Sequence, residues 1–120
     1  VLFRSVYGAS TNPERYAFKA TELLVAHKHE VVLVGQKTGE VLGLPILHGH
    51  PKLNEVDTMT LYVGPQNQGD LLAYIQVIQP RRIIFNPGTE NPSIYNELEK
   101  AGILVEEACT LVLLHTGQFD

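Results

Sequence analysis

The sequence predicts an α/β domain built as a three-layer sandwich, in which helices cover both faces of a mainly parallel, five-stranded sheet. Short β-branched apolar runs alternate along the chain with amphipathic stretches, and clusters of Gly, Pro and Asn separate them. The connections are short, as in consecutive strand–helix–strand units. The 120 residues suffice for one hydrophobic core, so we expect a single domain spanning 1–120.

Five segments have the β-branched, apolar character of buried strands. They are residues 1–7, 30–34, 58–63, 82–85 and 103–106, with an apolar extension of the last at 111–114. Residues 44–47 form either a short additional strand or an extended segment. Right-handed crossovers favour the strand order 3-2-1-4-5, in which the numbers follow the chain.

Three segments are predicted to be helical. They are residues 14–28, a stretch that opens at 65–69 and runs to residue 79, and residues 92–101. In the first, apolar residues recur at three- and four-residue spacing. Asn12 is suited to cap this helix and Pro13 to occupy its first position, while Gly102 suits a left-handed cap after the third helix. The polar segment 35–43 is expected to be a loop.

Composition and charge exclude several classes of protein. The formal net charge is −4, whereas proteins that bind nucleic acid without sequence preference carry an excess of Lys and Arg. No apolar run reaches the roughly 20 residues that span a bilayer, and no signal peptide is recognisable. Cys109 is the only cysteine, so an intrachain disulfide is excluded. We therefore expect a cytoplasmic protein with no nucleic-acid or membrane partner.

Two clusters of Gly, Asn and Pro lie far apart in the sequence but should meet in the fold. Gly8–Pro13 follows the first predicted strand, and Asn86–Asn91 follows the fourth. In a sheet of the predicted order these two strands are neighbours at the point where the chain reverses direction, and ligands bind at the carboxyl ends of the strands there. We therefore expect a ligand-binding crevice between the two loops.

The first of these loops has the chemistry of a phosphate-binding turn. Gly8 lets the backbone turn sharply or approach a ligand closely, and free N–H groups at the start of the following helix favour an anion. Ser10, Thr11 and Asn12 add side-chain donors. An ordinary strand-to-helix turn explains the segment equally well, because the complete G-x-G-x-x-G pattern is missing.

The end of the second predicted strand distinguishes among nucleotides. A domain that binds NAD places an acid there for the ribose hydroxyls, but this chain has Gly35, Gln36, Lys37 and Thr38. A lysine at this position suits an additional ribose phosphate, which both NADP and coenzyme A (CoA) carry. The alternative interpretation of Lys37 is a solvated loop lysine.

Four segments together resemble the small stand-alone CoA-binding proteins, a single-domain group similar to the N-terminal domain of the succinyl-CoA synthetase alpha subunit. They are YGASTNPERYAFKA, VVLVGQKTGEVLGLPI, RRIIFNPGTEN and EEACTLVLL, in that order, and the resemblance covers residues 7–119. It implies a Rossmann-like fold that binds coenzyme A or an acyl-CoA in the crevice as a non-catalytic nucleotide-binding module. The activity of the synthetase is not implied, because its phosphorylated histidine loop has no match here.

The resemblance also implies a set of ligand-binding residues. Gly8, Ala9, Ser10 and Asn12 would line the pyrophosphate, Tyr16 and Lys19 would lie near the ligand, Lys37 would face the adenosine phosphate, and Asn86, Pro87 and Gly88 would close the other wall. With Thr11 from the first loop, these residues are our predicted cofactor site. The synthetase pattern has a proline beside the lysine and two glycines after it, whereas here the neighbours of Lys37 are Gln36 and Thr38.

Two further functions would use the same crevice. NADP is an alternative ligand, and a CoA-dependent redox or transferase role through Cys109 is an alternative activity. No Ser, His and Asp set predicts a catalytic centre, and the two His-x-His pairs at 27–29 and 48–50 are poorly placed for a metal site. A monomer and a homodimer are equally compatible with the sequence.

Overall fold

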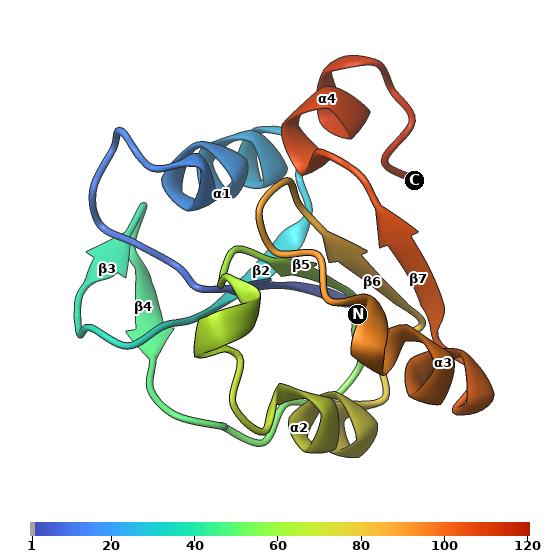
Figure 1. The fold of residues 1–120 in the computed structure, drawn as a ribbon. Coiled ribbons are helices and arrows are strands. Elements are labelled where there is room, and N and C mark those ends of the chain that lie inside the picture. The colour runs from blue at the N-terminus through green and yellow to red at the C-terminus, as the bar shows by residue number, and fades with distance from the viewer. Residues whose placement is uncertain (1) are drawn as a thin grey trace.

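The computed structural model describes residues 2–120, and the chain alternates between strands and helices along most of its length (Figure 1). The strands are β1 (Phe3–Tyr7), β2 (Glu30–Val34), β3 (Glu40–Val41), β4 (Leu44–Leu47), β5 (Val56–Leu61), β6 (Arg82–Phe85) and β7 (Leu104–Glu107). The helices are α1 (Tyr16–Ala26), the 3₁₀ turn η1 (Pro65–Asn67), α2 (Leu71–Ile78), α3 (Pro92–Lys100) and α4 (Thr110–His115). None of the helices within residues 2–120 combines the length and the apolar character needed to cross a bilayer.

One seven-stranded sheet forms the middle layer, in the order β3-β4-β2-β1-β5-β6-β7. Its pairs are parallel except that between β3 and β4. Helices α1 and α4 pack on one face over Val6, Leu33 and Ile84, and α2 and α3 pack on the other over Met59 and Phe85 (Figure 1). Alternate residues of a strand point to opposite faces, so each strand supplies side chains to both cores. The α/β fold class predicted from the sequence is confirmed.

The strand order differs from the predicted one in detail. We expected residues 58–63 to lie beyond the second strand, but β5 pairs with β1 and lies between β1 and β6. The place beside β2 belongs to β4, because residues 44–47 do form a strand and extend the sheet there. The predicted loop 35–43 contains the short strand β3, which pairs back onto β4.

The helix boundaries show where tertiary packing overrides local signals. Helix α1 begins at Tyr16 with Arg15 at the N-cap, so Asn12 does not cap it. Instead Asn12 Oδ1 accepts a hydrogen bond of 3.0 Å from the Glu14 amide within the preceding turn. The predicted 65–79 helix is divided into η1 and α2. The apolar run 111–114 belongs to α4 rather than to an extended strand, because the chain leaves the sheet after Glu107.

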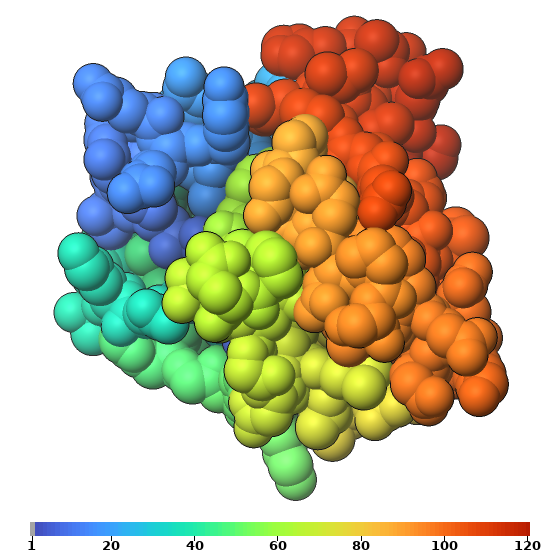
Figure 2. Space-filling view, in the orientation of Figure 1, coloured from blue at the N-terminus to red at the C-terminus, as the bar shows by residue number. Residues whose placement is uncertain are grey.

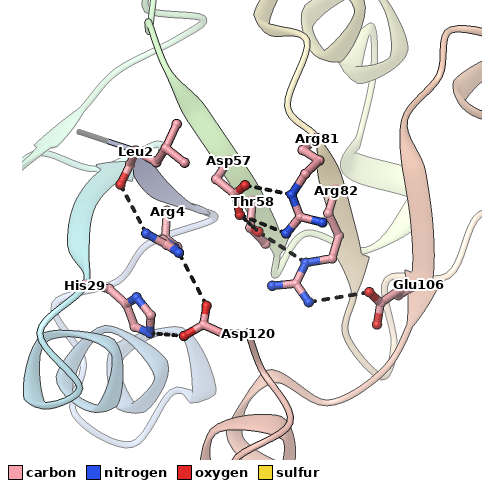
Figure 3. A network of polar contacts seen from close by, with 9 residues as sticks. All are labelled: Leu2, Arg4, His29, Asp57, Thr58, Arg81, Arg82, Glu106 and Asp120. Carbon is pink, nitrogen blue, oxygen red and sulfur yellow. Dashed lines mark hydrogen bonds and ion pairs between the residues drawn. The ribbon is translucent and has the colours of Figure 1, made fainter.

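A network of charged side chains occupies the amino ends of the strands, at the sheet edge opposite the two Gly/Asn/Pro loops. Figure 3 shows Arg81 aimed at Asp57, with Nε 2.8 Å from Oδ1, and Arg82 between Thr58 and Glu106. The hydrogen bonds from Arg81 lower the pKa of Asp57 to about 2 from its ordinary value of 3.8. Asp57 and Arg82 are buried members of this network, and each is paired with a more exposed partner, Arg81 and Glu106 respectively.

The lowered pKa of Asp57 predicts a specific loss of stability in acid. A carboxylate with a depressed folded-state pKa stabilises the fold above its unfolded pKa, and that contribution disappears as the pH falls from 4 to 2. We expect a loss of roughly 2 kcal/mol in the free energy of unfolding from this group. Urea titrations between pH 7 and pH 2 measure it. Between the same pH limits, the free energy of unfolding of the Asp57→Asn variant should fall by roughly 2 kcal/mol less than that of the wild type. Equal decreases in the two proteins would show that Asp57 is not responsible for the loss.

Candidate functional site

A cavity of about 700 Å³ opens at the carboxyl ends of the central strands, where the space-filling view is hollowed between the first loop, the η1 segment and the loop after β6 (Figure 2). This size is typical of sites for small molecules and cofactors. The loops after β1, β2, β5 and β6 contribute its walls. The lining residues are Gly8, Ala9, Ser10, Thr11, Asn12, Arg15, Tyr16, Ala17, Gln36, Lys37, Ile46, Tyr62, Val63, Gly64, Asn67, Pro87, Gly88 and Thr89.

The first loop is attached to the neighbouring strand by its own backbone. The Gly8 and Ala9 amides both donate to the carbonyl of Val34, at 2.8 and 2.9 Å. Gly8 has a φ of +99°, and a Cβ there would lie 2.9 Å from Val63 Cγ2. Glycine is therefore required both by the backbone conformation and by the close approach of the β5 loop. The two amides are already satisfied, so the sites for an anion lie further along the loop.

The amino end of α1 faces the same cavity. No side chain caps this helix, whose first two residues, Tyr16 and Ala17, line the cavity. The first N–H groups of a helix lack intrahelical acceptors and carry a partial positive charge, so they attract an anion. Arg15, at the N-cap, adds a full charge at this end.

The charged side chains of the cavity lining are all positive. Arg15 and Lys37 are its charged members, and none of the lining residues, all of which lie within 2–120, is acidic. The protein as a whole carries a net charge of −4, so a lining with two cations and no acid is opposite in sign to the overall charge. Such a lining favours an anionic ligand.

The opposite wall is uncharged. It is made by Tyr62, Val63 and Gly64 after β5 and by Pro87, Gly88 and Thr89 after β6, and we call these six residues the uncharged wall. Burial raises the pKa of Tyr62 to about 12, so its phenol stays neutral at physiological pH.

Nine of the eleven predicted site residues line the cavity: Gly8, Ala9, Ser10, Thr11, Asn12, Tyr16, Lys37, Pro87 and Gly88. The other two do not. Lys19 lies over the outside of α1, with Nζ 5.6 Å from the centre of the Tyr16 ring. Asn86 is 2 % exposed, and its amide binds inside the fold to Thr60, Leu61 and Thr110.

The structure also adds residues that sequence reasoning missed. Because β5 lies between β1 and β6, the predicted crevice between the first and fourth strands is spanned by the β5 loop, and Tyr62 to Gly64 enter the lining. The segment Gly64–Gly69 is rich in Gly, Pro and Asn, a turn signal that could have indicated this loop. Arg15 belongs to the segment YGASTNPERYAFKA, and its positive charge beside the start of the predicted helix is the signal that could have indicated it.

The remaining candidates lie elsewhere. Cys109 is at the N-cap of α4 and does not line the cavity. The histidines lie apart from it, and no cluster of three His, Cys, Asp or Glu residues suited to a metal ion occurs within 2–120.

Comparison with known proteins identifies the group to which this fold and site correspond. A family described as a CoA binding domain matches residues 5–115. The chain belongs to this family. No curated protein matches it. A crystal structure of a protein described only as uncharacterized is 44 % identical, with a TM-score of 0.95, and the match covers 99 % of this chain and 98 % of that one.

More distant members of the fold come from thermophiles. A Thermus thermophilus structure is 23 % identical over 98 % of this chain and 90 % of its own, with a TM-score of 0.85. A hypothetical protein from Pyrococcus horikoshii is 22 % identical over 98 % of this chain and 83 % of its own, with a TM-score of 0.83. At these identities the likeness shows the fold alone.

Proposed function

We propose that this CoA-binding domain protein binds coenzyme A or an acyl-CoA in the cavity at the carboxyl ends of β1, β2, β5 and β6, as a nucleotide-binding module without catalytic residues of its own. The observation that carries the proposal is the pairing of Arg15 and Lys37 with the uncapped amino end of α1, in a lining that has no acid. Coenzyme A carries a pyrophosphate and a ribose phosphate, so it presents negative charge at more than one point. Membership of the family supports CoA over other phosphorylated nucleotides.

Calorimetric titration of the folded protein with CoA, acetyl-CoA and NADP tests the proposal. We expect CoA and acetyl-CoA to bind, and NADP to bind more weakly or not at all. Binding should weaken as salt is added, because part of the attraction is electrostatic. An absence of CoA binding at millimolar concentration would refute the proposal. Tighter binding of NADP than of CoA would identify NADP as the ligand instead.

Reversing the charge of Lys37 tests which phosphate it faces. If Lys37 contacts the ribose phosphate, Lys37→Glu should weaken CoA binding about tenfold, the loss expected for one charge-assisted contact. Dephospho-CoA lacks that phosphate, so its affinity should be nearly the same for the variant and the wild type. Titrating both ligands into both proteins decides the point. An equal loss for the two ligands would show that Lys37 does not distinguish the ribose phosphate.

A further inference from the structure

Gln68 lies outside the cavity but joins the two loops that form the uncharged wall. Its side-chain amide donates to the carbonyl of Val63, at 3.0 Å, and to that of Thr89, at 2.8 Å. Its Oε1 accepts a hydrogen bond of 2.8 Å from Asn91 Nδ2. Val63 follows β5 and Thr89 follows β6, so one side chain connects both parts of the wall.

Because Gln68 is buried, solvent cannot substitute for its hydrogen bonds. The residue is 4 % exposed, whereas its neighbours Asn67 and Gly69 are exposed. A buried amide keeps its hydrogen bonds because water cannot replace them, and loss of one partner leaves the other group unsatisfied. Glutamine is also suited by its chemistry, since both donors meet carbonyls and the acceptor meets an N–H. A carboxylate could not donate to the two carbonyls, and an aliphatic side chain could make none of the three bonds.

The wall held by Gln68 differs in character from the rest of the site. Lys37 follows β2 and Arg15 precedes α1, whereas the uncharged wall follows β5 and β6 on the far side of β1 in the sheet. The cavity lining is thus cationic at one end and uncharged at the other, where the Gly88 amide donates to the exposed carboxylate of Glu90 at 2.8 Å. Coenzyme A has the same polarity, because its phosphates lie on the adenosine half and its pantetheine arm carries amides and a thiol without charge.

We propose that Gln68 is a positioning residue that holds the uncharged wall in its binding conformation, and that this wall receives the pantetheine arm of CoA. The inference rests on the proposed function, since it assigns the two halves of one ligand to the two ends of one cavity. Gln68 acts through Val63 and Thr89 and does not itself touch the ligand.

The test separates the two halves of the ligand. We would titrate Gln68→Asn and Gln68→Met with CoA and with adenosine 3′,5′-bisphosphate, which keeps the nucleotide half and lacks the arm. Asparagine keeps the amide but is one methylene too short to span both carbonyls, and methionine keeps the length without the amide. Gln76→Asn, on the exposed side of α2, is the matched control.

We expect both Gln68 variants to bind CoA about tenfold more weakly, and the affinity for adenosine 3′,5′-bisphosphate to stay within a factor of two. The control should resemble the wild type with both ligands. Unfolding curves identify variants that are folded at the titration temperature, and the milder Gln68→Asn keeps the test available if the methionine variant does not fold.

Three results would overturn the inference. An equal loss for both ligands would mean that Gln68 supports the domain in general and not this wall. Unchanged CoA affinity would mean that the wall does not depend on Gln68. If the wild type binds CoA no more tightly than adenosine 3′,5′-bisphosphate, the pantetheine arm does not contribute to binding. Each of these differs from the failure of the proposed function, in which wild-type protein does not bind CoA.

Discussion

Replacing both cavity cations in the variant Arg15→Glu/Lys37→Glu should weaken CoA binding about a hundredfold, the largest effect on affinity that we expect. Arg15 and Lys37 are the charged residues of the lining, so the double replacement turns a cationic cavity into an anionic one. Each substitution removes a charge-assisted contact to phosphate, and the new carboxylates repel the ligand. The amides at the start of α1 remain and should retain a small residual attraction.

Calorimetry at two salt concentrations measures this effect. The wild type should lose affinity as salt rises, whereas the double variant should gain some, because salt screens a repulsion. Lys28→Glu/Lys52→Glu changes the net charge equally at residues outside the lining, so it controls for the overall field of the protein. If that control variant lost as much affinity as the cavity variant, the cavity would not be the binding site.

Asn86→Ala should cause the largest loss of stability, about 3 kcal/mol in the free energy of unfolding. Asn86 Nδ2 donates to Thr60 Oγ1 at 2.7 Å and to the Leu61 carbonyl at 2.8 Å, and Oδ1 accepts from the Thr110 amide at 2.8 Å. Alanine leaves two backbone groups unpaired where water does not reach them. The Asn86 side chain connects β5, β6 and the start of α4, so its loss should destabilise the sheet as a whole and not one strand alone.

Chemical denaturation of Asn86→Ala measures the loss. Asn96→Ala, on the exposed side of α3, is the matched control. Its free energy of unfolding should lie within roughly 0.5 kcal/mol of the wild-type value, as is usual for surface substitutions. The same variant decides how Asn86 contributes to the site. If Asn86 is structural, its replacement lowers the free energy of unfolding and leaves the CoA affinity of the folded fraction nearly unchanged. Unaltered stability with lost CoA affinity would instead support the ligand contact that the family resemblance implies.

Much of the local structure could be predicted because short segments carry it themselves. The strands predicted at 30–34 and 82–85 coincide with the observed β2 and β6, since β-branched apolar runs bounded by turn residues leave few alternatives. For residues 44–47 the sequence allowed a strand or an extended segment, and the structure has the strand β4. The first loop was predicted from Gly8 and the polar residues that follow it, and the structure places it in the cavity wall. These features depend on neighbouring residues along the chain.

Helix ends and the last apolar run were less predictable. Residues 111–114 have the composition of a strand, but the sheet ends at Glu107 and the run packs as α4 beside α1. Propensity is a weak guide for such short apolar segments, because tertiary packing decides whether they extend or coil. For the same reason Asn12, suited by type to cap α1, lies within a turn before it.

The sequence by itself determined the α/β class, most of the strands and the glycine-dependent first loop, and it predicted an anionic ligand. Only the tertiary structure decided that β5 lies between β1 and β6, because strand pairing depends on contacts between segments far apart in the chain. That order brings Tyr62, Val63 and Gly64 into the cavity. It also gives Gln68 two carbonyls to bind and directs Asn86 into the fold rather than toward a ligand.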